Sequence, residues 1–207
     1  MYIKIDVDIS KVAGWGRSMT EQTIRQAQAS AVNKLVALAQ TAMRREIVRE
    51  FNVSASFVRE RLKVRKASAR GTGFIIEAVL TGSGSSGAKR SANLIHFVEK
   101  SISLAEARRR LRAGEGQSSR NRTFELRAKI KRGAGPKIVK GAFIGNKGRT
   151  VFIREGNTRL PIKPVQTIDV PQMFNTKRVN GRVVALIESR GKQQLEHELR
   201  YYMSRQG

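Results

Sequence analysis

The chain has 207 residues, of which 41 are Lys or Arg and 16 are Asp or Glu, so its formal net charge at pH 7 is +25. It contains no run of about 18 uncharged apolar residues, which excludes a membrane-spanning helix. It also contains no cysteine, which excludes disulfides, thiolate metal sites and cysteine nucleophiles. Because 40% of the residues are hydrophobic, we expect a single cored domain over residues 1–207. Its charge favours a polyanionic or acidic partner.

The positive charge is spread along the chain. Residues 17–70 hold 12 basic and 4 acidic residues, residues 71–122 hold 9 and 4, and residues 123–165 hold 11 and 2. This pattern differs from a basic arm joined to a neutral domain, because the same segments carry the apolar pattern of a fold. The first residues, MYIKID, lack the apolar run of a secretory signal, so we expect the cytosol or a particle assembled there.

Two long helices are predicted, one near each end of the chain. The first covers residues 18–51 and is capped by Ser18 or Thr20. Its apolar or small residues repeat every three or four positions: Ile24, Ala27, Ala31, Leu35, Leu38 and Ala42, widened by Val32, Val36, Ala39, Met43 and Ile47. The second covers residues 181–204, with a stripe formed by Val184, Ile187, Gly191, Leu195, Leu199 and Tyr202. In that helix Gly191 indicates a bend or a close contact.

The remaining pattern is mostly that of strands. We expect strands at residues 2–8, 74–80, 123–130, 138–144 and 150–154, the last two forming a hairpin around residues 146–148. Prolines confine residues 160–171 to extended or edge conformations. Short helices are expected after Ser54 or Ser56 and at residues 103–112. Residues 65–73 are expected to form a basic connector, and residues 82–92 and 112–122 flexible insertions. The predicted fold class is α+β, with the two long helices packed on a central antiparallel sheet or small barrel.

The sequence shows few features of a catalytic site. His96 lies in an apolar run, which favours a core or interface position, and His197 lies between two glutamates that point about 100° away on either side of it around a helix. No nucleophile elbow or phosphate-binding glycine loop occurs. We therefore expect no enzyme activity, no metal site and no cofactor.

The clustered basic residues suit phosphate contact without base reading. Because aromatic residues make up only 6% and do not alternate with these clusters, a stacking platform is not indicated. Contact with an acidic protein explains each cluster equally well, so both alternatives stay open. The candidate contact residues are Arg44, Arg45, Arg108, Arg109, Arg110, Arg112, Lys129, Lys131 and Arg132.

Residues 141–174 read GAFIGNKGRTVFIREGNTRLPIKPVQTIDVPQMF. The hairpin G-R-x-V-F-x-R, followed by R-L-P-I and V-P-x-M-F, resembles the minor tail protein Z family of lambda-like bacteriophages and the broader phage tail-completion proteins. The segments Ala31-Val32-Asn33-Lys34 and residues 58–63 are similar to the amino-terminal half of that family. The resemblance covers roughly residues 20–204. Where relatives often show Gly-Pro-Ser, this chain has Thr167-Ile168-Asp169.

The resemblance implies a structural minor virion protein that completes the head-proximal end of the tail and supports head–tail joining and DNA passage. It implies a homohexameric ring near the neck, assembled in the host cytoplasm, with the tail terminator, the tail tube and the end of the tape measure as partners and viral DNA in the channel. Candidate interface residues are Phe152, Arg154, Arg159, Leu160, Pro161, Ile162, Pro171, Met173 and Phe174, with core packing equally compatible for Phe152 and Ile162. The alternative is a cytoplasmic sequence-nonspecific nucleic-acid-binding protein of ribosomal or nucleoid type.

Overall fold

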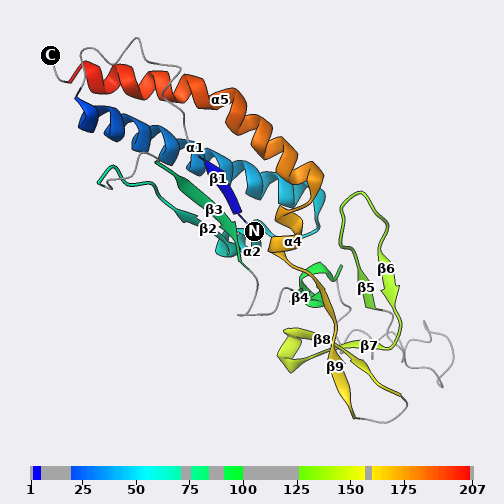
Figure 1. Ribbon diagram of the computed structural model, residues 1–207. Helices are drawn as coiled ribbons and strands as arrows, with labels where there is room; N and C mark the ends of the chain where they lie inside the picture. The colour runs from blue at the N-terminus through cyan, green and yellow to red at the C-terminus, as the bar shows by residue number, and fades with distance from the viewer. Residues whose placement is uncertain are drawn as a thin grey trace.

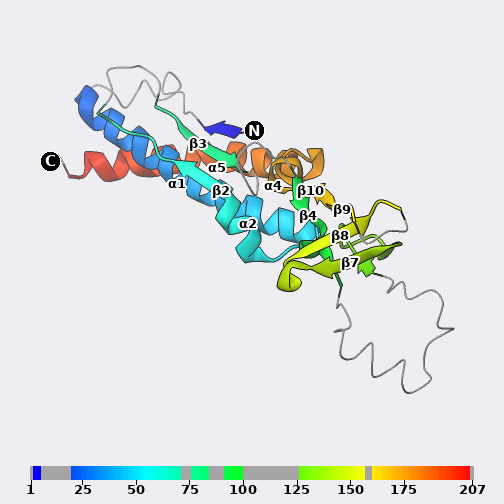
Figure 2. The same cartoon turned by 90° about the horizontal axis from the view of Figure 1, so that it is seen from below.

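Helix α1 (Glu21–Glu50) forms the central layer of a computed structural model that describes residues 2–5, 20–70, 76–83, 91–99, 126–156 and 160–205. Helix α5 (Lys177–Met203) lies along one side of α1, and a three-stranded sheet lies along the other (Figures 1 and 2). The predicted cap is confirmed, because the Thr20 side chain accepts a hydrogen bond from the backbone N–H of Thr23. The predicted helix at residues 103–112 and the insertion at 112–122 lie outside the described residues.

Helices α1 and α5 run antiparallel. Near one end Arg182 pairs with Glu46 at 2.5 Å, and near the other Lys34 pairs with Glu198 at 2.6 Å. The α1 residues buried toward its neighbours repeat every four positions: Ala27, Ala31, Leu35, Ala39, Met43 and Ile47. Val32 and Val36 are buried beside this row, so the predicted wide stripe is confirmed at most of its positions.

Two details of the predicted helical stripes are wrong. Leu38 is 39% exposed, because it lies about 100° around the helix from the buried Ala39. A Cβ built at Gly191 would meet nothing within 4 Å among the described residues, so the close contact expected of this glycine is wrong, while the bend stays a prediction. The α5 side chains buried within the described structure lie near its two ends, at Val179 and Val183 and again from Leu195 onward.

The sheet beside α1 is antiparallel, in the order β1 (Tyr2–Ile5), β3 (Ala78–Gly82) and β2 (Leu62–Arg65). Strand β2 corrects the sequence prediction, which did not assign residues 62–64 to a strand and took Arg65 as the start of a connector. Strand β3 likewise extends to Gly82, which was assigned to a flexible insertion. Gly82 pairs with Leu62, and a Cβ there would lie only 3.5 Å from the Phe174 side chain.

Two short helices close the core. Helix α2 (Ala55–Arg61) begins after Ser54, whose hydroxyl accepts from Phe57 N–H, as predicted. Helix α4 (Val170–Phe174) has Asp169 as its N-cap and Pro171 in its first turn, so the expectation of an extended chain through 171 is wrong there. Proline is compatible with a first helical turn, because its missing N–H has no partner in the helix at that position.

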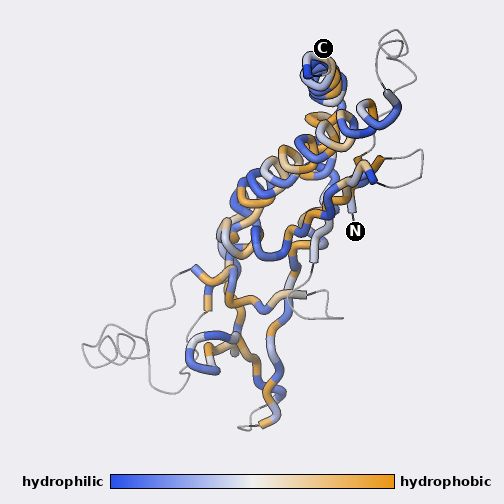
Figure 3. Tube along the Cα trace, turned by 90° about the vertical axis from the view of Figure 1, so that its left-hand side faces the viewer, coloured by the Kyte–Doolittle hydropathy of each residue, from blue (hydrophilic) through white to orange (hydrophobic). Residues whose placement is uncertain are grey.

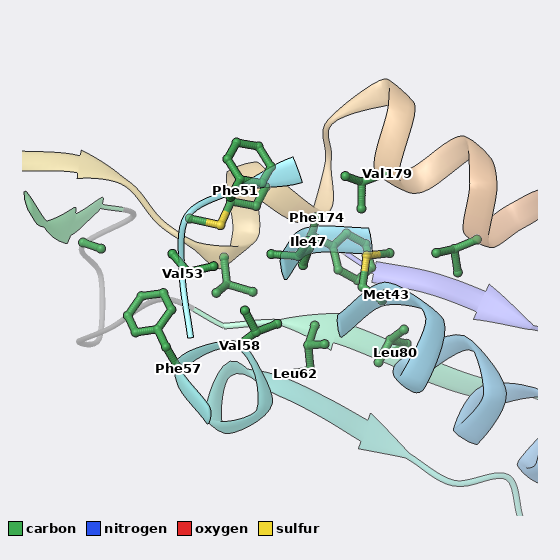
Figure 4. Packing of buried hydrophobic residues seen from close by; sticks show 14 of the residues in the cluster. Met43, Ile47, Phe51, Val53, Phe57, Val58, Leu62, Leu80, Phe174 and Val179 are labelled. Carbon is green, nitrogen blue, oxygen red and sulfur yellow. The ribbon is translucent and has the colours of Figure 1, made fainter. Parts of the chain in front are cut away.

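The main hydrophobic core is formed where α1, α2, α4, β3 and the start of α5 meet (Figure 4). Its large buried side chains include Met43, Ile47, Phe51, Val58, Leu80, Met173 and Phe174. A second, smaller cluster joins Ala27 and Ala31 of α1 to Leu195 and Leu199 of α5. The two clusters fix α5 to α1 at separate points.

Residues 126–156 and 160–168 form an arm, which extends away from the end of the helical layer where α1 ends and α5 begins (Figures 1 and 2). It contains β5 (Leu126–Ala128) paired with β6 (Lys137–Val139), and a sheet ordered β7 (Ala142–Gly145), β8 (Thr150–Arg154) and β9 (Ile162–Pro164). The hairpin around the turn η3 (Asn146–Gly148) is confirmed. The strand predicted at residues 138–144 is divided at Gly141, where φ is +72°.

The α+β class is confirmed, with the described strands distributed over four antiparallel sheets. Strand β4 (Ser91–Asn93), assigned in part to the insertion at 82–92, pairs with β10 (Gln166–Ile168) and leads into the 3-10 helix η2 (Leu94–Phe97). Residues 84–90 of that insertion lie outside the described residues.

The Asn93 side chain links β4 to strand β8 of the arm by hydrogen bonds. Its Oδ1 accepts from Val151 N–H at 2.8 Å, and its Nδ2 donates to Val151 C=O at 3.2 Å, so one side chain imitates the pairing of a neighbouring strand. Asn33 of α1 makes the same two-point contact with Ala67, at 2.7 and 3.0 Å. These bonds are specific because only an amide offers a donor and an acceptor side by side.

We expect Asn93→Ala to lower the free energy of unfolding by about 2–3 kcal/mol, because the substitution leaves both backbone groups of Val151 without the amide partner. Urea unfolding measures the effect. Asn175→Ala is the matched control, since Asn175 is exposed. Equal unfolding midpoints for the two variants would contradict this role of Asn93.

Candidate interaction surfaces

The described residues contain no group of three or more His, Asp or Glu side chains placed to hold a metal ion. Two acidic side chains among the described residues are almost fully buried: Asp169, the N-cap of α4, and Glu198, whose side chain is 1% exposed between α5 and α1. The Glu198 carboxylate accepts from Ser30 Oγ at 2.7 Å, Lys34 Nζ at 2.6 Å and Gln194 Nε2 at 2.9 Å. These contacts make Glu198 a structural link between the helices.

Two opposing effects act on the pKa of Glu198. Burial alone would raise the pKa, but hydrogen bonds from Lys34, Ser30 and His197, together with the charge of Lys34, lower it below its ordinary value of 4.5. The carboxylate is therefore ionised in the folded protein at neutral pH. His197 lies beside it, with Nδ1 3.2 Å from Glu198 Oε1.

His96 also has a structural explanation. Its ring lies 4.3 Å from that of Phe57, centre to centre. Burial of part of the ring and the charge of Arg61 lower the pKa of His96 below 6.5. The side chain is exposed overall, so the predicted core position is wrong, and its partner within the described structure is an aromatic ring.

The tertiary structure brings two of the predicted basic clusters together. The β5–β6 hairpin passes the C-terminal end of α1, where Arg132 N–H donates to Glu50 C=O at 3.0 Å and Arg132 Nε donates to Phe51 C=O at 3.3 Å. Lys131 forms an isolated β-bridge with Phe51. A guanidinium at this position also complements the negative end of the helix dipole.

We call Arg45, Arg49, Lys131 and Arg132 the helix-end basic cluster. All four residues are exposed, two on the last turns of α1 and two on the hairpin. The neighbouring carboxylates of Glu46 and Glu50 pair with α5, through Arg182 at 2.5 Å and Arg178 at 3.4 Å, and Glu46 also pairs with Arg49 at 3.7 Å. The cluster therefore carries an excess of positive charge at one end of the helical layer.

The other predicted basic residues do not join this cluster. Arg44 is half-buried. Lys129 is half-buried and pairs with Glu99 at 3.8 Å. Arg108, Arg109, Arg110 and Arg112 lie outside the described residues.

Part of the predicted interface gathers on one face of the β7–β8–β9 sheet. Residues opposite each other on paired strands share a face, and the register sets Phe143 beside Phe152, Phe152 beside Pro164, and Arg154 beside Ile162. We call these five residues the outer sheet face. Leu160 and Pro161, just before β9, are both exposed, and Leu160 is 65% exposed. Phe143 and Pro164 were not predicted, although pairing across the expected hairpin already aligns Phe143 with Phe152.

The rest of the predicted interface belongs elsewhere. Met173 and Phe174 are buried at 0% and 1% exposure, and Pro171 is half-buried in α4. The prediction of an interface role for Met173 and Phe174 is wrong because α4 turns both side chains into the core. The spacing of Asp169 and Gln172, a capping box, is the sequence signal that indicates this helix. Arg159 lies outside the described residues.

Among the described residues, no helix combines the length and apolar character needed to cross a membrane. Compared with models of protein families, residues 17–206 match Prophage minor tail protein Z (GPZ). No curated protein and no solved structure was found to match the chain.

The lowered pKa of Glu198 predicts a pH-dependent stability. Because the folded pKa lies below the unfolded value, this carboxylate stabilises the fold above about pH 4.5, and the stabilisation is lost as the pH falls through the folded pKa. Glu198→Gln should lower the unfolding free energy at pH 7 by about 1–3 kcal/mol. It should also flatten the acid limb of a plot of urea midpoint against pH.

Glu188→Gln is the control for that experiment, since Glu188 is exposed on the same helix. An acid limb of equal slope in wild type and Glu198→Gln would refute the assignment.

Proposed function

Because this chain belongs to the Prophage minor tail protein Z family, it is a phage tail protein, and we propose that it completes the head-proximal end of the tail. In this role it supports the joining of tail to head and the passage of DNA. The observation that carries the proposal is the extent of the family match, from residue 17 to residue 206 of 207. The work is assembly, and we assign the protein no catalytic role.

We propose that six copies form a ring near the neck of the virion. The long helices and the arm extend in different directions, so each copy offers separated surfaces to its neighbours (Figures 1 and 2). Separated, dissimilar surfaces suit the head-to-tail contacts that close cyclic oligomers. Tail terminator, tail tube and the end of the tape measure are the proposed neighbours. Assembly takes place in the host cytoplasm.

The helix-end basic cluster is the proposed point of contact with DNA in the channel. Its four exposed cations come from two elements held together by backbone hydrogen bonds, so their spacing is set by the fold. Contacts of this kind bind phosphate without reading bases. This suits a protein past which DNA of any sequence must move. A ribosomal or nucleoid role is set aside, since the family is one of tail proteins.

A phage that lacks this gene should produce filled heads and separate tails that fail to join, and infectivity should return on complementation with the wild-type gene. Electron microscopy of the complemented particles should place six copies at the head-proximal end of each tail. Joined, infective particles without the protein would contradict the proposed function, and a position at the distal tip would contradict the location.

The triple variant Arg45→Gln, Arg49→Gln, Lys131→Gln should bind duplex DNA more weakly. The slope of log K against log salt should fall by about 2–3 units, at roughly 0.9 per lost phosphate contact. Arg132 is left intact because it bonds to the end of α1. Fluorescence titration between low and physiological salt gives the slope.

The matched control is Arg190→Gln, Lys192→Gln, which removes two exposed cations from the middle of α5. If the salt slope of the triple variant equalled that of wild type, the helix-end basic cluster would not be a site of DNA contact.

A further inference from the structure

The outer sheet face is apolar but lies outside the core. The opposite face of the same sheet supplies Ala142 and Val151 to the main core, and Ile144 packs against that core. Phe143, Phe152 and Ile162 neither belong to the core nor pack against it within the described structure, and all three are half-buried. Figure 3 shows hydrophobic residues continuing into this end of the molecule, far from the C-terminus.

Ring packing and strand pairing hold the residues of this face in fixed positions. The rings of Phe143 and Phe152 lie 6.0 Å apart and 30° from parallel. A Cβ at Gly145 would lie 3.0 Å from two atoms of the Phe152 ring, so the ring rests directly on a glycine backbone. Strand pairing on both sides of β8 holds these residues in place. Because these side chains are already held in place before binding, little conformational entropy is lost when a partner covers them.

The charge around the face selects the partner. The arm contains ten Lys or Arg residues and a single acidic residue, Glu155, which pairs with Lys163. A second copy of the arm would bring two strongly positive surfaces together, which opposes self-association through this face. A partner protein with an apolar patch bordered by acidic residues would complement both the apolar centre of the outer sheet face and the basic residues around it.

A single-stranded nucleic acid fits the face less well. Base stacking needs an open aromatic ring, but the Arg154 guanidinium lies 5.1 Å from the centre of the Phe143 ring. On the other ring, Phe152, one side rests on Gly145. The remaining contact atoms come from Ile162 and Pro164, which offer no ring face for a base.

We propose that the outer sheet face docks onto another protein of the tail, at an apolar patch bordered by Asp and Glu. This proposal rests on the proposed function, because it names the chemistry of one partner in the tail. Arg154, together with Lys147 and Arg149 at the turn of the hairpin, provides the cations for the acidic border. The helix-end basic cluster remains available for a different contact.

Photo-crosslinking in assembled tails tests the proposal. The full chain, with p-benzoylphenylalanine in place of Phe143, is supplied to a phage that lacks the gene, and purified tails are irradiated and analysed by mass spectrometry. We expect crosslinks to an Asp/Glu-bordered segment of one other tail protein. The control places the same probe at Ile138, an exposed apolar residue of β6 in the same arm, and its yield with that segment should be about tenfold lower.

Crosslinks from Phe143 to a second copy of this chain, to DNA, or to no tail component would overturn the docking proposal while leaving the tail role intact. Absence of the wild-type chain from tails would overturn the tail role as well. These results separate the two proposals.

A paired variant gives a second measurement. Leu160→Ser, Ile162→Ser should reduce incorporation into tails by at least about tenfold, the loss expected when interface anchors are truncated. Ile138→Ser should incorporate normally. Urea midpoints of the purified proteins should match wild type, since the two side chains lie outside the core. Normal incorporation of the folded double variant would also overturn the proposal.

Discussion

The burial of α1 on more than one side is the constraint on which the rest of the structure depends. Most of the stability of a helix within a protein comes from the packing of its apolar face, and here α5, β3 and α2 each cover part of the surface of α1. The row from Ala27 to Ile47 begins with two small side chains, Ala27 and Ala31, which pack against Leu195 and Leu199 of α5. Asn33 and Gln40, at the side of that row, bind the backbone of residues 62–67 and so hold the edge of the sheet.

The few carboxylates of the described structure are used mainly within it. Glu46, Glu50 and Glu198 join the two long helices, Asp169 caps α4 and lies 3.6 Å from Arg61, and Glu77 binds Lys4 and Arg65. Because the acidic groups are paired internally, the large excess of basic residues remains to define the outer field. This distribution explains how a chain of charge +25 can hold a core together and still attract polyanions.

The arm joins this body through polar contacts that demand a particular geometry. Asn93 aligns β8, and Arg132 joins the β5–β6 hairpin to the end of α1. These bonds bring the basic hairpin to the helix end and direct the apolar outer sheet face away from the core. One architecture thus carries two surfaces of different chemistry, one cationic and one apolar with a cationic border. An assembly protein that meets both DNA and protein neighbours would need both.

The sequence by itself determined the elements whose signals are local: the two long helices, the Thr20 and Ser54 caps, the hairpin at residues 146–148, the α+β class and the tail protein family. Periodicity and capping depend on neighbours within a few residues, so they can be read without the fold. Only the tertiary structure decided that Leu62–Arg65 is a strand, because β2 exists through its pairing with β3.

Long-range packing also decides which of the candidate site residues are buried and which are exposed. Met173 and Phe174 resembled Phe152 and Ile162 in sequence, yet one pair is buried against Gly82 and α1 and the other faces outward. Arg132 is far from α1 in the chain and reaches the end of that helix only because the hairpin crosses it. Charge and apolar content are properties of the sequence, but which of these residues share a surface is decided by long-range packing.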